Sequence, residues 1–126
     1  MAFGIDELSG DADAVVGGKR LVVEADGALM QAAIAGDPAA AALIATDELK
    51  QIASCDPHYS WAMAQCYSLL NDAPAALLWL ETAMDRGFIN YPMISKLDPL
   101  LDNAREAPGF PALLNRIEIR WETFEI

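Results

Sequence analysis

The chain has 126 residues, of which 54% are apolar, and its formal net charge is −11 because 19 acidic residues outnumber 8 basic ones. This length and apolar share suffice for one folded domain with a buried core, and they exclude a disordered tail. The acidity argues against nucleic acid and against an anionic membrane surface as partners, since both bind clustered cations.

The beginning of the chain is acidic and contains few large apolar side chains. We expect residues 1–20 to form a flexible acidic lead-in and residues 21–126 to form one helical domain. The stretch Val15–Glu24 is ambiguous. It predicts either a small hairpin around Gly17-Gly18 or a loop that leads into the first helix.

Neither a secretory signal nor a membrane span is expected. The segment up to Asp13 is acidic where a signal peptide would carry a basic start and an apolar run. The longest apolar run, Ala39 to Ala45, is too short to cross a bilayer. We therefore expect a cytoplasmic protein, in which Cys55 and Cys66 do not form a disulfide.

Three Asp-Pro pairs mark expected helix starts. The Asp carboxylate can accept hydrogen bonds from the unpaired amides of a first helical turn. Pro fits at the first helical position because its missing N–H is not needed there. The pairs are Asp37-Pro38, Asp56-Pro57 and Asp98-Pro99, and Ala73-Pro74 and Phe110-Pro111 give weaker starts.

Apolar residues recur at helical spacing between these starts, which predicts an all-α chain. Gly36 and Gly87 are typical of helix ends, where a glycine adopts the left-handed conformation most easily. We expect helices over residues 21 or 25 to 35, 38 to 54, 57 to 70, 74 to 86, 99 to 105 and 111 to 124, with one or two turns within 93–97.

The stretch from Pro57 to Gly87 predicts two antiparallel helices joined by Asn71-Asp72. Small residues recur where the two helices must touch, and larger ones recur where gaps must be filled. The small residues are Ala64, Ala76 and Ala83, and the larger ones are Met63, Tyr67 and Leu80. A hairpin with this alternation is typical of stacking repeats.

This hairpin resembles a tetratricopeptide repeat. The matching residues are Ala64 and Tyr67 in the first helix and Ala76, Leu80 and Ala83 in the second. Two positions depart from the pattern, because Ser60 replaces a large apolar residue and Phe88 replaces a proline. The preceding helix pair fits poorly: Ala41 matches, but Glu48 stands where a small residue is expected. The resemblance implies a tetratricopeptide-like stack of helical hairpins with a C-terminal capping helix.

The C-terminal half is similar to the end of some bacterial signalling proteins, in which such a module follows a serine/threonine kinase, a cyclase or a transcription-factor domain. The segments that carry this resemblance are 77–81, 86–92, 97–101, 108–110 and 120–126. The resemblance extends over about residues 35–126. It implies a non-catalytic module for protein–protein interaction or scaffolding in signalling, either standing alone or ending a longer protein.

Residues suited to chemistry are few. Cys55, His58 and Cys66 are the soft metal ligands, whereas a structural zinc site needs four ligands. Ser60 and His58 point apart on a helix, which argues against a catalytic pair. Gly17-Gly18-Lys19 lacks the rest of a phosphate-binding loop. We therefore expect no catalytic residue, no metal and no cofactor.

The resemblance also implies a candidate binding groove. The first helix of each tetratricopeptide pair lines the concave side of the array, which places His58, Trp61, Gln65 and Ser68 there. A tryptophan and a neutral amide suit recognition of a peptide or loop from another protein. The competing interpretation places Trp61 in the core and leaves the other three as plain surface.

Aromatic residues gather in the second half of the chain. They are Trp79, Phe88, Tyr91, Phe110, Trp121 and Phe124. Any that the core cannot hold would form an apolar patch, so one alternative is a structural homo-oligomer that associates through this surface. They could instead form a satellite core under residues 88–96. A further alternative is a small-molecule-binding or enzymatic helical protein.

Overall fold

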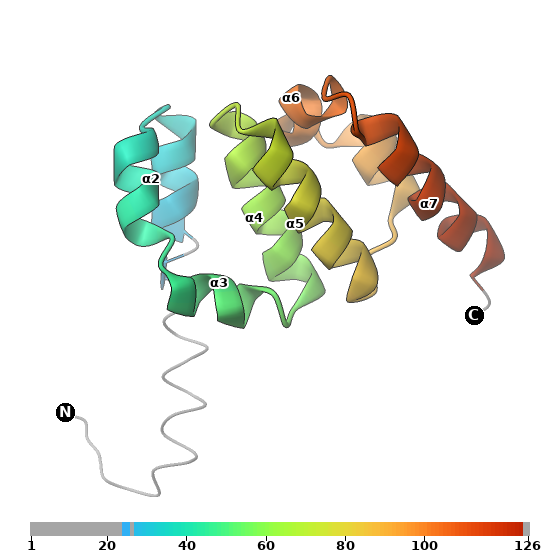
Figure 1. Cartoon of the computed structure of the whole chain (residues 1–126), viewed down its shortest axis with the longest axis horizontal. Helices are drawn as coiled ribbons and strands as arrows, with labels where there is room; N and C mark the ends of the chain where they lie inside the picture. The colour runs from blue at the N-terminus through green and yellow to red at the C-terminus, as the bar shows by residue number, and fades with distance from the viewer. Residues whose placement is uncertain (1–23, 26, 125–126) are drawn as a thin grey trace, which may run out of the picture.

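A computed structural model describes residues 24–25 and 27–124, which form helices joined by short connections and contain no strand. The all-α prediction is therefore confirmed for this part of the chain. The lead-in expected over residues 1–20 lies outside the described residues, as does the ambiguous stretch as far as Val23. Figure 1 shows α4 and α5 in the middle, with α2 and α7 at opposite ends.

The elements follow one another closely. A helical segment ends at Ile34. It is followed by α2 (Pro38–Ile44), α3 (Asp47–Ala53), α4 (Pro57–Leu69) and α5 (Ala73–Asp85). The second half contains the π-helical turn η1 (Met93–Leu97), the 3-10 turn η2 (Pro99–Leu101), α6 (Asp102–Arg105) and α7 (Phe110–Thr123).

Aspartate side chains cap the predicted helix starts. The Asp56 carboxylate accepts hydrogen bonds from the amides of His58 and Tyr59, at 2.8 and 3.1 Å. The other capping aspartates are Asp37 before α2, Asp72 before α5 and Asp98 before η2. In each case the next residue or the one after it is proline, so the Asp-Pro predictions are confirmed.

The single helix predicted over residues 38–54 is wrong. The chain leaves the helical conformation at Ala45, with φ −81° and ψ 67°, and a new helix begins after Thr46. The Thr46 hydroxyl accepts a hydrogen bond from the amide of Leu49 at 3.2 Å. A threonine cap in the middle of an apolar pattern therefore divides it into α2 and α3, which point in different directions (Figure 1).

Helices α4 and α5 form the predicted hairpin. Asn71 turns the chain in the left-handed region at φ 61°, a conformation that asparagine tolerates better than most residues. Ala64, Ala76 and Ala83 are fully buried, as their expected place between close-packed helices requires. Met63 and Leu80 are also fully buried, so the core of the hairpin agrees with the alternation of small and large residues.

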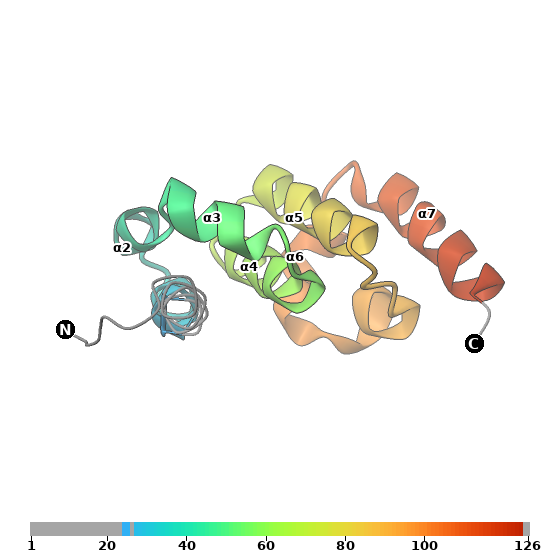
Figure 2. The same cartoon turned by 90° about the horizontal axis from the view of Figure 1, so that it is seen from below.

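The helices lie in two rows. Figure 2 shows α2, α5 and α7 along one side of the molecule, and α4 with the segment 91–105 along the other. The helical residues 27–34 continue the second row beyond α4. Helix α4 contacts α3, α5, η2 and α6, and α5 also contacts α6 and α7.

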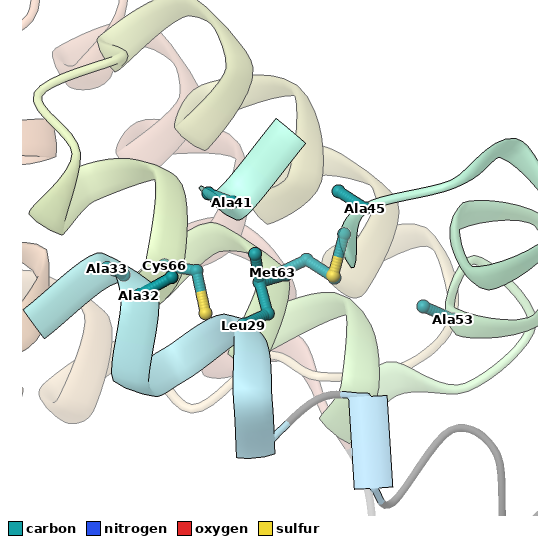
Figure 3. Close-up of a cluster of buried hydrophobic side chains, with 8 residues drawn as sticks. All are labelled: Leu29, Ala32, Ala33, Ala41, Ala45, Ala53, Met63 and Cys66. Atoms are coloured by element: carbon teal, nitrogen blue, oxygen red, sulfur yellow. The ribbon is translucent and has the colours of Figure 1, made fainter. Parts of the chain in front are cut away.

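Two apolar cores hold the rows together, one on each side of α4. The first core contains Leu29, Ala32, Ala33, Ala41, Ala45, Ala53, Met63 and Cys66 (Figure 3). The second contains Ala64, Leu80, Met84, Ile94, Leu101, Phe110, Leu113 and Ile117. Because α4 contributes to both cores, it connects the two ends of the described structure.

Candidate binding surfaces

The stripe predicted to line a groove on α4 instead packs against the following segment of the chain. The Gln65 side-chain amide donates a hydrogen bond to the Asp98 carboxylate at 2.8 Å. The Ser68 hydroxyl is fully buried and accepts a hydrogen bond from the amide of Ala104 at 3.1 Å. The placement of Ser68 in an open groove is therefore wrong, because η2 and α6 cover this side of α4.

Trp61 and His58 lie at the other end of the same stripe. The Trp61 ring stacks on Phe88 with ring centroids 4.7 Å apart, and His58 meets the edge of Phe88 at 6.0 Å. Trp61 is half-buried against the second core, and its buried indole N–H has no hydrogen-bond partner among the described residues. His58 is the one exposed residue of the four predicted groove residues.

The C-terminal aromatic residues separate into two groups. Phe110 is buried in the second core, and Trp79, Phe88 and Tyr91 are half-buried against it. This group agrees with the satellite-core interpretation. Trp121 and Phe124, by contrast, are 44% and 62% exposed. Among the described residues, the exposed tryptophan and phenylalanine side chains therefore lie at the end of α7.

This uncovered surface continues the buried stripe of α7. Phe110, Leu113 and Ile117 face the core at helical spacing, and Trp121 and Phe124 extend the same series by four and seven residues from Ile117. Figure 1 shows α7 at the end of the described structure opposite α2. The apolar stripe of α7 is thus buried as far as Ile117 and exposed at Trp121 and Phe124.

A cleft of about 490 Å³ lies between the end of α5 and the last turn of α7, and Phe124 forms part of its wall. Arg120 crosses this region by donating a hydrogen bond to the carbonyl of Met84 at 3.1 Å, and it lies 3.9 Å from the Asp85 carboxylate. Arg86, which also lines the cleft, donates to the carbonyl of Ser54 at 2.9 Å. Both charged and apolar groups therefore border the open end of the stack.

A second cleft of about 350 Å³ lies between α2, α3 and the junction of α4 with α5. Alanines of α2 and Leu70 form apolar walls, while Lys50, Tyr67 and Asp72 supply polar groups. The sequence did not predict this cleft. A continuous helix over residues 38–54 would place Lys50 on the same helix as the residues of α2. The break at Thr46 is what brings Lys50 to the cleft.

Residues 24–25 and 27–124 contain no group of three or more histidine, cysteine or acidic side chains placed to hold a metal ion. Within the same ranges, no helix is long and apolar enough to cross a membrane. Cys55 is exposed and Cys66 is buried in the first core, and these two cysteines form no disulfide with each other.

Comparison with protein-family models, with curated proteins and with solved structures finds no match.

Proposed function

We propose that this chain is a non-catalytic protein-interaction or scaffolding module built from tetratricopeptide-like helical hairpins. The support is the resemblance of residues 57–87 to such a repeat, together with two rows of stacked helices that share cores between neighbouring units. The resemblance of the C-terminal half to bacterial signalling proteins supports a cytoplasmic role in signalling or regulation.

The observation that carries the proposal is the uncovered stripe at the end of α7. Trp121 and Phe124 continue the register of Phe110, Leu113 and Ile117, and both are exposed. Phe124 also lines the cleft at the end of α5. Exposed aromatic residues are typical of protein-docking surfaces, since their burial contributes much of the binding free energy. A partner segment would complete the core that the last turns of α7 leave open.

The expected partner has an apolar docking face with a basic rim. The net charge of −11 attracts a basic protein and repels an acidic one over long range. Close to the stripe, Glu118 is half-buried and Glu122 is exposed on α7, so both can meet basic groups at the rim of the contact. Apolar contact would provide affinity, while the acidic surface would set the association rate and the choice of partner.

The test removes the exposed aromatics without touching the core. We would immobilise the protein, pass lysate of the source organism over it, and quantify the retained proteins by mass spectrometry. The variant is Trp121→Ser with Phe124→Ser. The control is Leu43→Ser, which removes an 82% exposed apolar side chain from α2 at the other end of the stack. Circular dichroism and thermal unfolding would show that all three proteins are folded.

The proposal expects a small set of proteins that wild type and the Leu43 variant retain and that the aromatic variant loses by tenfold or more. Retention should also weaken as salt increases, because the acidic surface contributes to association. Equal retention by all three proteins would place the binding elsewhere. Retention of no protein above the bare support would contradict an interaction module.

The same stripe gives one alternative, a homo-oligomer in which two copies cover each other's Trp121 and Phe124. Light scattering separates the two functions, because the chain has a mass of 13.6 kDa and a dimer would have twice that mass. A dimer that the aromatic variant dissolves, and that the Leu43 variant preserves, would favour the structural homo-oligomer. A monomer at working concentrations would favour a separate partner.

A further inference from the structure

The cleft between α2, α3 and the α4–α5 junction has an apolar floor. Ala41 of α2 and Ala45, which follows the end of α2, are buried in the first core and expose only small faces to the cleft, while Ala42 lies at its exposed rim. Leu70 adds a larger apolar wall at the end of α4. Because three of these residues are alanines, the side chains leave space that a branched aliphatic group can occupy.

Opposite charges border the same cleft without pairing. Lys50 is half-buried, and its ammonium makes no hydrogen bond or ion pair within the part of the chain that the structure describes. Asp72 caps the start of α5. One of its carboxylate oxygens accepts a hydrogen bond from the amide of Ala75 at 3.3 Å. Its second oxygen accepts no hydrogen bond from these residues.

Tyr67 places a third polar group at the cleft. Its ring packs against the first core while the residue remains half-buried, and its hydroxyl has no hydrogen-bond partner among residues 24–25 and 27–124. A phenol can donate or accept a hydrogen bond. The cleft therefore combines an apolar floor with a cation, an anion and a neutral polar group, which is the composition of a small-ligand site.

We infer that this cleft binds a small zwitterion with an aliphatic body, of the chemical class of an apolar α-amino acid. Lys50 pairs with the ligand carboxylate, Asp72 pairs with its ammonium, and the alanines with Leu70 enclose the aliphatic side chain. A ligand with a single charge can pair with Lys50 or with Asp72, but not with both. The volume of about 350 Å³ lies at the lower end of the range for small-molecule pockets, which suits a molecule of this size.

This site is separate from the surface proposed for protein binding. It is built from α2, α3 and the start of the α4–α5 turn, whereas the exposed aromatics lie at the end of α7 (Figure 1). The inference goes beyond the proposed interaction function and does not rest on it. Failure of either one leaves the other to be judged on its own experiment.

The experiment titrates the full chain with three probes while its amide resonances are followed by NMR. The probes are leucine, isocaproate, which lacks the amino group, and isoamylamine, which lacks the carboxylate. We expect leucine to shift resonances of residues 41–45, 50 and 67–72, and to bind about tenfold or more tightly than either singly charged probe, because each lacks one charge-assisted contact.

Two variants locate the binding. Ala42→Leu fills the rim of the cleft with a residue that favours helices, and Lys50→Gln removes the cation while keeping a long polar side chain. The control is Lys96→Gln, since Lys96 is an exposed lysine on η1 and is remote from the cleft lining. We expect Ala42→Leu to abolish leucine binding, Lys50→Gln to weaken it about tenfold, and Lys96→Gln to leave it unchanged.

Three results would overturn the inference. The first is the absence of shifts with leucine at tens of millimolar. The second is equal binding of leucine and one singly charged probe, which would show that one charged side chain is not used. The third is equal loss of binding in the Lys50 and Lys96 variants, which would indicate nonspecific attraction to positive charge.

Discussion

At the scale of single residues, a buried carboxylate joins two units of the stack. Asp98 is 2% exposed, and both of its oxygens are used. One accepts a hydrogen bond from the amide of Leu100 at 3.0 Å, and the other accepts from the side chain of Gln65 at 2.8 Å. The first bond begins η2, and the second attaches η2 to α4. The Asp-Pro motif predicted the cap but contained no information about the contact with Gln65.

Replacing Asp98 tests this double role. Asp98→Ala should lower the free energy of unfolding by about 1–3 kcal/mol, because it removes the cap and leaves the Gln65 amide without its partner. Asp98→Asn should lose less, since its oxygen can still accept from Leu100 and a flipped Gln65 amide can accept from its nitrogen. Urea unfolding measures both. Equal stability of wild type and the alanine variant would show that the contact contributes nothing.

At the scale of elements, the main departure from expectation is the division of residues 38–54 into α2 and α3. The apolar periodicity continued across Ala45 and Thr46, although Thr46 followed by Asp47 and Glu48 is a local signal for a helix start. The structure ends α2 because the Thr46 hydroxyl caps a new helix and because Leu49 and Ala53 are then buried. Burial of both apolar faces outweighs the helical hydrogen bonds lost at the break.

The cap at Thr46 can be tested directly. Thr46→Ala should destabilise the protein by about 0.5–2 kcal/mol, because the amide of Leu49 loses its acceptor, and Thr46→Ser should restore most of this loss. Chemical unfolding followed by circular dichroism measures the difference. An alanine variant with higher stability and more helix than wild type would instead favour the continuous helix over residues 38–54.

At the scale of the whole molecule, the two cores are connected through α4. Met63 and Cys66 pack toward the N-terminal helices, while Ala64 packs toward α5 and the C-terminal segment. Each end of the described structure belongs to one core, whereas α4 contributes to both, so the ends can open at a lower free-energy cost than the centre. The α4–α5 hairpin should be the most stable part of the described structure.

Core truncations at the two ends test this order. Ile117→Ala, in the fully buried stripe of α7, should cost about 2–5 kcal/mol and should raise hydrogen exchange first in α7 and residues 91–105. Leu29→Ala is the matched variant in the first core, and it should raise exchange first in residues 27–53. A uniform increase across the chain in both variants would indicate one cooperative unit without separable ends.

The candidate sites were less predictable than the helices. The repeat resemblance placed Gln65 and Ser68 on an open concave side, but residues 93–105 pack there because Asp98, Asn103 and Ala104 offer hydrogen-bond partners to them. The aromatic residues allowed two interpretations, a leftover apolar patch or a satellite core. Trp121 and Phe124 agree with the first, and Phe110 with its half-buried neighbours agrees with the second. The packing of α5 against α7 decides which aromatic side chains stay exposed. A local sequence pattern does not predict this packing.

The sequence by itself determined the local features: the helix starts at Asp-Pro, the turn at Asn71, the helix end at Gly87 and the small residues inside the α4–α5 hairpin. These depend on hydrogen bonds, backbone preferences and spacing within a few residues along the chain. Only the tertiary structure decided whether the local cap signal at Thr46 would break the helix, and it also decided the covering of the α4 stripe, the exposed end of α7 and the cleft beside Lys50. Each of these results from competition for burial between segments distant in sequence, and that competition is settled only when the helices pack.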